Sequence, residues 1–165
     1  MADEVAGEDY GLLNWGSHRP ALIALARFLP IHSVIEFGAG QYSTRLFLDR
    51  KHFPLLTSLT SFEHEKDWAE KVRTDDPRHT LHVMQPKEFV AASVGLKADF
   101  VFIDSAGDRF LLTDHSLTLA PIFAMRDCRE GQLRDMGFKY VRGFNSVVQT
   151  VFVSNTIDLA GIKLT

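Results

Sequence analysis

Four acidic residues each follow an apolar run of the kind that forms a buried strand: Glu36, Glu63, Asp104 and Asp127. If these runs form neighbouring parallel strands, the acids surround one crevice at the carboxyl ends of the strands. So much negative charge would repel a phosphate-rich ligand and attract a ligand with a positive centre. A carboxylate can also accept hydrogen bonds from two adjacent ribose hydroxyls. The pattern therefore indicates a site for a ligand that combines a ribose, an amino group and a positive charge.

A glycine turn follows the first of these acids. Gly38, Ala39 and Gly40 lie between the apolar run and a second segment that begins near Ser43 and Thr44. Glycine lets the main chain turn sharply and lets a ligand approach the backbone. A helix that begins here would offer free amide groups at its N-terminus. These residues predict a ligand-binding turn between a strand and a helix.

Strand and helix patterns alternate along the chain and would position the acids. Pro20 suits the first turn of the first helix, which has apolar residues at helical spacing on one face. We predict helices over 16–30, 43–51, 65–73, 86–95, 108–120 and 130–136. We predict strands over 33–37, 55–63, 79–85, 98–105 and 121–128, then a closing hairpin over 138–154. This alternation is typical of an α/β fold, in which helices cover both faces of a parallel sheet.

Length and composition indicate one globular unit. The 165 residues suit one domain, which we place at 15–165 after a loose lead-in at 1–14. The net charge of −3 lacks the basic excess typical of nucleic-acid binding. No apolar run reaches the length of a membrane helix, the N-terminus lacks a signal-peptide pattern, and a single cysteine allows no internal disulfide. We therefore expect a cytoplasmic protein that binds neither nucleic acid nor a membrane.

Three motifs in order resemble a known family. The stretch VIEFGAGQYST at 34–44 resembles motif I of class I S-adenosylmethionine-dependent methyltransferases, in the EFGxGxxST form of some small bacterial members. The stretches TSFEHEKDWAEKV at 60–72 and ADFVFIDSAGDR at 98–109 resemble the second-strand and fourth-strand motifs of this family. The resemblance implies a doubly wound, mostly parallel, seven-stranded Rossmann-like sheet of order 3-2-1-4-5-7-6, with strand 7 antiparallel. It also implies S-adenosylmethionine as the cofactor and methyl transfer as the reaction.

The same resemblance implies roles for individual residues. The paired glycines would lie under the methionine part of the cofactor, Glu36 would help to hold its ammonium group, and Glu63 would bind the ribose hydroxyls. Residues after the third strand would border the adenine, and His64 would rim the same pocket. The cofactor-binding residues implied in this way are Glu36, Gly38, Ala39, Gly40, Ser43, Thr44, Glu63, His64, Met84, Gln85 and Asp104.

The catalytic expectation concerns proton removal from the acceptor. The sulfonium cofactor is already activated, so the protein mainly has to align the acceptor with the methyl group and exclude water from the site. Where the acceptor must lose a proton, Asp104 is the first candidate base and Asp127 the second. His18 and Trp15, ahead of the first helix, could fold over the methionine end of the cofactor. The acceptor itself is expected to be a small molecule or an exposed side group.

Other interpretations of the sequence remain open. A nicotinamide-dinucleotide domain would also use a glycine turn, but it would leave Glu36 without a role. A non-catalytic protein of the same fold could bind the cofactor or act by contact alone. We predict no metal: Asp104 and Asp127 occupy positions that bind a divalent ion in some methyltransferases, but Cys128 stands where an amide ligand would be needed. A second subunit, as in a homodimer, could complete the acceptor pocket.

Overall fold

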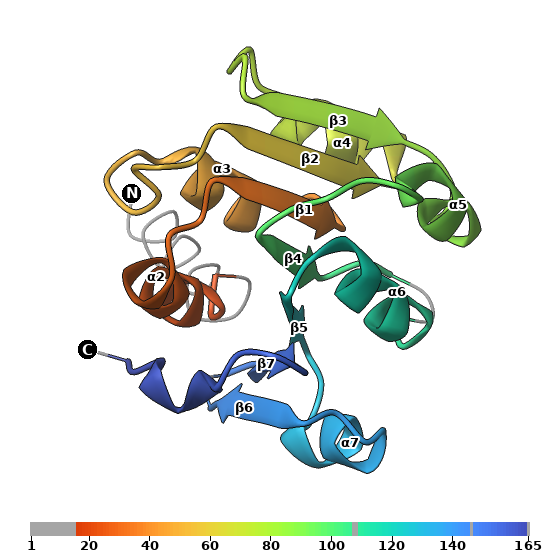
Figure 1. Cartoon of the computed structure of the whole chain (residues 1–165). Coiled ribbons are helices and arrows are strands. Elements are labelled where there is room, and N and C mark those ends of the chain that lie inside the picture. Colours follow the sequence, from red (N-terminus) through yellow and green to blue (C-terminus); the bar gives the residue numbers. More distant parts are fainter. Residues whose placement is uncertain (1–15, 107–108, 146, 165) are drawn as a thin grey trace, which may run out of the picture.

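The computed structural model describes residues 16–106, 109–145 and 147–164, which form a seven-stranded sheet with helices on both faces (Figure 1). The strand order is β3-β2-β1-β4-β5-β7-β6, and β7 runs antiparallel to both of its neighbours. The strands are β1 Ser33–Phe37, β2 Ser58–Glu63, β3 His79–Val83, β4 Phe100–Ile103, β5 Ile122–Arg126, β6 Tyr140–Phe144 and β7 Thr150–Ser154. The predicted fold class and strand order are confirmed. The lead-in predicted at 1–14 and the residue Trp15 lie outside the described residues.

The helices follow the predicted order with shorter spans. They are α2 Arg19–Phe28, α3 Ser43–Leu48, α4 Lys66–Val72, α5 Phe89–Ser93, α6 Leu111–Leu119 and α7 Glu130–Asp135, with 3₁₀ turns η1 Pro86–Glu88 and η2 Leu159–Gly161. The predicted helix over 43–51 ends early because the Asp49 carboxylate accepts the backbone N–H of Lys51 at 2.9 Å, which forms a turn. Within the described ranges, no helix is long and apolar enough to cross a membrane.

The strand order reverses between β1 and β4, which places a crevice at their carboxyl ends. β1 pairs in parallel with β2 on one side and with β4 on the other. The chain leaves these two strands toward opposite faces of the sheet, because α3 and α4 lie on one face and α5 and α6 on the other (Figure 1). In open α/β sheets the ligand site lies at such a reversal.

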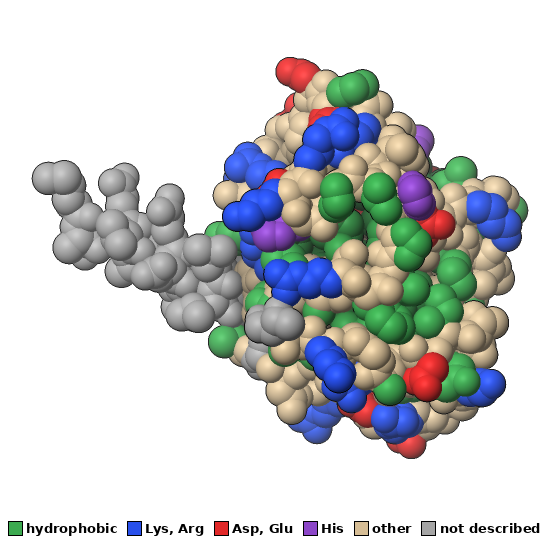
Figure 2. Space-filling view, turned by 60° about the vertical axis from the view of Figure 1, so that its left-hand side comes forward, with side chains coloured by type: hydrophobic (Ala, Val, Ile, Leu, Met, Phe, Trp, Pro, Cys, Tyr) green, Lys and Arg blue, Asp and Glu red, His purple; other side chains and the backbone are tan. Residues whose placement is uncertain are grey.

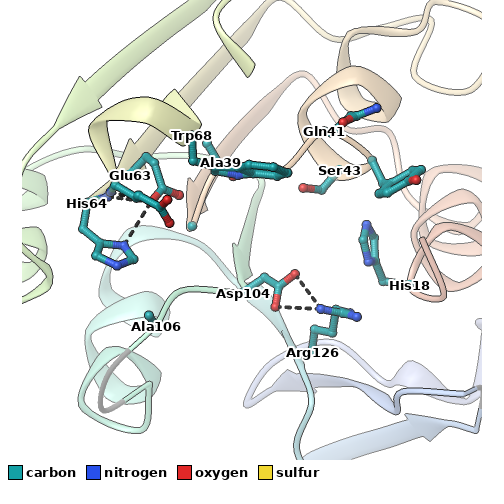
Figure 3. Close-up of a pocket in the computed structure, with 14 residues that line it drawn as sticks. His18, Ala39, Gln41, Ser43, Glu63, His64, Trp68, Asp104, Ala106 and Arg126 are labelled. Atoms are coloured by element: carbon teal, nitrogen blue, oxygen red, sulfur yellow. Dashed lines mark hydrogen bonds and ion pairs between the residues drawn. The ribbon is translucent and has the colours of Figure 1, made fainter. Parts of the chain in front are cut away.

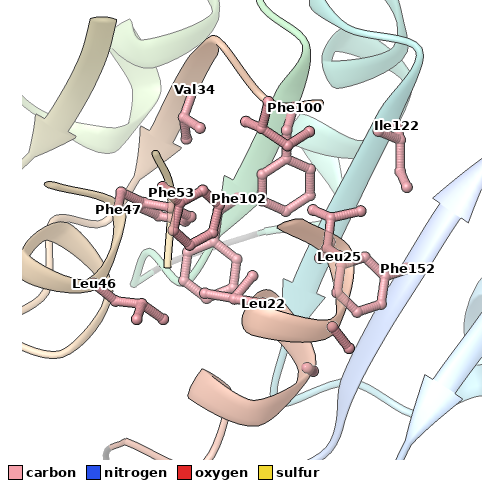
Figure 4. Close-up of a cluster of buried hydrophobic side chains, with 14 of the residues drawn as sticks. Leu22, Leu25, Val34, Leu46, Phe47, Phe53, Phe100, Phe102, Ile122 and Phe152 are labelled. Atoms are coloured by element: carbon pink, nitrogen blue, oxygen red, sulfur yellow. The ribbon is translucent and has the colours of Figure 1, made fainter. Parts of the chain in front are cut away.

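Two hydrophobic cores hold the helices against the sheet. One core lies under α2 and α3, where the Phe47 ring packs edge-on against Phe53, Phe100 and Phe102 at 5.2–6.2 Å between ring centroids (Figure 4). The other core lies under α5, α6 and α7, and includes the stacked rings of Phe37 and Phe89. Aromatic pairs of this kind add stability beyond the area that they bury. The central strands β1 and β4 are therefore packed on both faces, which suits a site built at their carboxyl ends.

The face of the molecule shown in Figure 2 carries charges of both signs. Figure 2 shows Lys and Arg side chains around a central hydrophobic area, with Asp and Glu side chains nearby.

Candidate functional site

The loop after β1 is shaped by a close approach to β4. Gly38 has φ +90°, and a Cβ atom at this position would lie 2.5–2.6 Å from backbone atoms of Asp104 and Ser105. A residue with a side chain would therefore clash with the backbone as well as adopt a strained conformation. Gly40 is also confined, because a Cβ atom there would lie 2.7 Å from Oγ of Ser43. The two glycines bring the loop down onto the carboxyl end of β4.

Glu36 lies fully buried beneath this loop. Its Oε1 accepts the hydroxyl of Ser43 at 2.5 Å, and its Oε2 accepts the hydroxyls of Thr44 and Ser61 at 2.7 Å each. Burial raises the pKa of Glu36 to about 7, although the three hydroxyl donors lower it. The carboxylate does not line the cavity described below. Glu36 therefore holds the first turn of α3 through the hydroxyls of Ser43 and Thr44. Its carboxylate does not contact the cavity in which a ligand's ammonium group would lie.

Glu63 ends β2 and presents one carboxylate oxygen to the site. Its Oε1 accepts the backbone N–H groups of His64 and Glu65 at 2.8 Å each. His64 Nδ1 lies 2.9 Å from the same oxygen. Oε2 accepts no hydrogen bond from the described part of the chain. The side chain is thus fixed by its own backbone while one oxygen remains available to a ligand.

A cavity of about 710 Å³ opens at the carboxyl ends of β1, β2, β4 and β5 (Figure 3). This volume lies within the range of about 300–1,000 Å³ that small-molecule sites usually have. The indole of Trp68 extends over it from α4, where Nε1 donates to the Ala39 carbonyl at 2.8 Å. This bond ties α4 to the glycine loop, so the rim of the cavity is held from two elements.

Asp104 and Arg126 form an ion pair at the floor of the cavity. One guanidinium nitrogen of Arg126 lies 3.2 and 3.3 Å from the two carboxylate oxygens of Asp104. The Arg126 side chain is only 7% exposed and the Asp104 side chain 20%. Burial raises the pKa of Asp104 to about 6, and the positive charge of Arg126 opposes this rise. Asp104 therefore faces the cavity as a carboxylate whose negative charge is largely offset by the guanidinium of Arg126.

The structure brings most of the predicted residues together. The predicted residues that line the cavity are Gly38, Ala39, Gly40, Ser43, Glu63, His64 and Asp104. Glu36 and Thr44 lie in the layer beneath it. Met84 and Gln85, predicted to border an adenine, do not line it. Met84 instead packs against the core under α5, and Gln85 is exposed beside η1.

Asp127 does not reach the cavity. Its side chain is 67% exposed and pairs with Arg109, whose Nη2 lies 3.1 Å from Oδ2. Its backbone has φ +56°, which turns the chain away after β5. The next residue, Cys128, is buried, and burial raises the pKa of its thiol to about 12. No group of three or more His, Cys, Asp or Glu side chains placed to hold a metal ion occurs among the described residues.

Two of the cavity residues that were not predicted, Trp68 and Arg126, shape the site most clearly. The indole of Trp68 is half-buried and lines the cavity, although its place on an amphipathic helix is equally typical of a core residue. A role for Arg126 could have been predicted from the sequence, because a charged residue at the end of the buried strand β5 needs a partner of opposite charge. Its partner, Asp104, lies 22 positions away, directly after the neighbouring strand β4. The pairing depends on sheet register, which the pattern of apolar residues does not give.

Comparison with known proteins shows a shared fold. No protein-family model matches the chain, and no curated protein matches its sequence. The O-methyltransferase TomG from Streptomyces achromogenes, solved with SAM, is 16% identical with a TM-score of 0.62, over 83% of this chain and 79% of that chain. An O-methyltransferase from Bacillus cereus, solved with SAH, is 14% identical with a TM-score of 0.63, over 83% of this chain and 80% of that chain.

A human protein has a similar structure as well. Human methyltransferase-like protein 13, solved with SAH, is 18% identical with a TM-score of 0.59, over 92% of this chain and 81% of that chain. At these identities the likeness shows the fold, which is that of Rossmann-like methyltransferases. The chain therefore has the class I methyltransferase fold with a cavity at its strand reversal.

Proposed function

We propose that this protein is an S-adenosylmethionine-dependent methyltransferase that acts on a small molecule or an exposed side group. The observation that carries the proposal is Glu63: a fixed carboxylate ends β2, and its Oε2 is open to a cavity beside the glycine loop. A carboxylate in this place can accept hydrogen bonds from the two hydroxyls of a ribose. Structures of similar fold were solved with SAM or SAH, which supports the same cofactor here.

The residues present fit such a cofactor. Oε2 of Glu63 would hold the ribose, and the backbone of Gly38 and Gly40 would lie beside the amino-acid part. When bound, S-adenosylmethionine supplies a methyl group on a positively charged sulfur, which an acceptor atom can displace in line. Trp68 covers one side of the cavity and helps to exclude water from it. Asp104 and Arg126 together present an ion pair at the floor, whose carboxylate side would face a sulfonium centre more favourably than its guanidinium side.

Two alternatives make different predictions. A nicotinamide-dinucleotide domain would bind NAD in the same crevice and would also use Glu63 for a ribose. A non-catalytic protein of this fold would bind S-adenosylhomocysteine, or no nucleoside, and would not turn over. The acidic residues Glu63 and Glu65 at the rim of the cavity disfavour the diphosphate of NAD, because like charges repel in a poorly solvated site.

Calorimetric titration tests the proposal. We expect wild-type protein to bind S-adenosylhomocysteine and not NAD. Glu63→Gln keeps an oxygen for the backbone N–H groups but replaces Oε2 by an NH₂ group, which cannot accept a ribose hydroxyl. The lost hydrogen bonds to a charged group should cost about 1.5–3 kcal/mol, which is roughly a 10- to 150-fold weaker affinity. Glu70→Gln, an exposed glutamate on α4 outside the cavity, is the matched control. Equal affinity in wild type and Glu63→Gln would remove Glu63 from the site.

A further inference from the structure

A chain of hydrogen bonds leads from the buried carboxylate of Glu36 to the edge of the sheet. Ser61, its neighbour in the register of β1 and β2, is fully buried and donates its hydroxyl to Oε2 at 2.7 Å. Nε2 of His79 lies 3.1 Å from the Ser61 hydroxyl oxygen, and Nδ1 lies 3.3 Å from the Thr74 hydroxyl oxygen. His79 begins the edge strand β3, and both it and Thr74 are only half-buried. The chain therefore joins a buried acid to a ring that is partly exposed to water.

The charge of Glu36 determines which nitrogen of His79 carries the proton. An ionised carboxylate can only accept, so Ser61 gives it the hydroxyl proton and accepts the Nε2–H of His79. Nδ1 then accepts the hydroxyl of Thr74. When Glu36 is protonated on Oε2, Ser61 accepts from the acid and donates to Nε2, so the ring proton must lie on Nδ1. The tautomer of His79 therefore reports the ionisation of Glu36.

The pKa values allow this change near neutral pH. Burial raises the pKa of Glu36 to about 7, and the charge of Asp104 adds to the rise while the hydroxyl donors oppose it. Burial lowers the pKa of His79 below 6.5, with the charge of Asp76 acting against this shift and that of Arg73 acting with it. The ring is therefore neutral while Glu36 titrates, which a change of tautomer requires.

Glu36 also holds the turn beside which a cofactor would lie. Its carboxylate accepts the hydroxyls of Ser43 and Thr44, and Oγ1 of Thr44 accepts the backbone N–H of Gly40 at 3.1 Å. Ser43 and Gly40 line the cavity. Hydrogen bonds to an ionised carboxylate are stronger than those to a neutral acid, although ionisation in a buried place costs fold stability. The turn is therefore held most firmly when Glu36 is ionised.

We propose that His79 is a positioning residue for this turn: through Ser61 it relays protons between water and Glu36 and stabilises the ionised acid, the form in which the turn binds the cofactor most tightly. The cofactor part rests on the methyltransferase function proposed above. To neutralise the acid, a proton from water adds to Nδ1 of His79, Nε2 gives its proton to Ser61, and Ser61 gives its own proton to Oε2. One proton enters and one carboxylate is neutralised, and the reverse steps return the proton to water.

Ring NMR of the protein without ligand tests the relay. The ¹⁵N signals of His79 show which nitrogen carries the proton, and the ¹³C carboxyl signal of Glu36 shows its ionisation. We expect the ring proton on Nε2 at about pH 8 and on Nδ1 at about pH 6, with the midpoint where Glu36 titrates. Glu36→Gln assigns the carboxyl signal and should leave His79 in one tautomer at all of these pH values.

A second Ser–His pair is the internal control. Nε2 of His115 lies 2.8 Å from the hydroxyl oxygen of Ser93, which donates to the Phe89 carbonyl at 2.7 Å. Burial lowers the pKa of His115 as well. Because this chain ends on a backbone carbonyl and not on an acid, His115 should keep its proton on Nε2 throughout. Ser61→Ala breaks the first chain and should stop the change of tautomer in His79.

Binding of S-adenosylhomocysteine tests the positioning role. In wild type the affinity should rise about two- to tenfold between about pH 6 and about pH 8, as expected for one hydrogen bond. His79→Phe removes the N–H that supports ionised Glu36 through Ser61, so the rise should move to higher pH. His82→Phe is the matched control, since His82 lies on the same strand but stacks on Phe62 at 5.1 Å between centroids, and it should behave as wild type.

Two titratable groups that line the cavity are present in all of these proteins. Burial raises the pKa of Asp104 to about 6, so part of the rise in wild type comes from Asp104. Burial, with the charges of Arg126 and Arg19, lowers the pKa of His18 to about 3, so His18 stays neutral at these pH values. Glu36→Gln keeps both groups, and the part of the rise that this variant loses belongs to Glu36.

Two results would overturn the inference. A single tautomer of His79 while Glu36 titrates would place the acid proton on Oε1, toward Ser43, and would refute the relay. A rise in affinity that stays at the same pH in His79→Phe, or moves equally in His82→Phe, would refute the positioning role. Absence of S-adenosylhomocysteine binding to wild type would refute the proposed function and the positioning role with it, while the tautomer of His79 would still decide the relay.

Discussion

The buried carboxylate of Glu36 should make the protein less stable as the pH rises. Its pKa is raised from 4.5 to about 7, chiefly by burial. Below about pH 4.5 the group is protonated in both the folded and the unfolded state, so it has no effect on the balance. Between the two values the unfolded state has lost its proton while the folded state keeps it, so the free energy of unfolding falls. Above about pH 7 both states are ionised and the decrease is complete.

The size of the effect follows from the two pKa values. A rise from 4.5 to about 7 corresponds to about 3 kcal/mol of unfolding free energy. Glu36→Gln removes the ionisation and keeps the shape, and its amide can still bond to the hydroxyls of Ser43, Thr44 and Ser61 once they rotate. We therefore expect the variant to equal or exceed wild type in stability at about pH 8, and to lose the advantage at about pH 5.

Urea unfolding of both proteins at these two pH values measures the effect. The contribution of His18 occurs in both proteins and cancels when the two pH differences are compared, and most of the Asp104 contribution does so too, apart from the part that comes from its charge acting on Glu36. We expect wild type to lose up to about 3 kcal/mol more than Glu36→Gln between about pH 5 and about pH 8. The same pH dependence in the two proteins would show that Glu36 is ionised in the fold at all of these pH values, and the reasoning from burial would be wrong.

Two further substitutions test the geometry of the site. Gly38→Ala should cost at least about 3 kcal/mol in thermal or urea unfolding, because it adds a backbone clash to a left-handed conformation; Gly95→Ala, with φ +83° and open space around it, should cost only about 1–2 kcal/mol. Equal losses in the two variants would show that the loop is not pressed against β4. Arg126→Met should raise the pKa of Asp104 above about 6 in a ¹³C carboxyl titration, because the opposing positive charge is gone. Arg73→Met, at an exposed pair on the end of α4, is its control, and an unchanged pKa of Asp104 would contradict the ion pair.

The order of the sheet could be predicted because local and global signals agree. The apolar runs that end in Glu36, Glu63 and Asp104 each form a strand, and the segments between them form helices. The reversal of the strand order at β1 followed from the resemblance of the motifs and is confirmed. The predicted ends of the helices and strands were less accurate, because such ends depend on single side-chain contacts such as the turn at Asp49.

The site could be predicted only in part, because it depends on contacts between distant residues. The glycine loop and Glu63 line the cavity as expected, since the carboxyl ends of neighbouring strands meet at one edge. Glu36 lies beneath the cavity and accepts three hydroxyl hydrogen bonds. One of these donors, Ser61, lies on another strand, and no local sequence pattern indicates this contact. Asp127 was expected near Asp104, but the left-handed backbone after β5 directs it outward. Such a turn cannot be read from an Arg-Asp-Cys stretch.

A crystal structure of the protein with S-adenosylhomocysteine tests the central claim most directly. We predict that both ribose hydroxyls lie within hydrogen-bond distance of Oε2 of Glu63, or share it with Oε1, and that the amino-acid tail lies beside the backbone of Gly38 and Gly40. The sulfur should face the part of the cavity that contains His18 and Asp104. A nucleoside bound elsewhere, or a ribose that makes no contact with Glu63, would contradict the account.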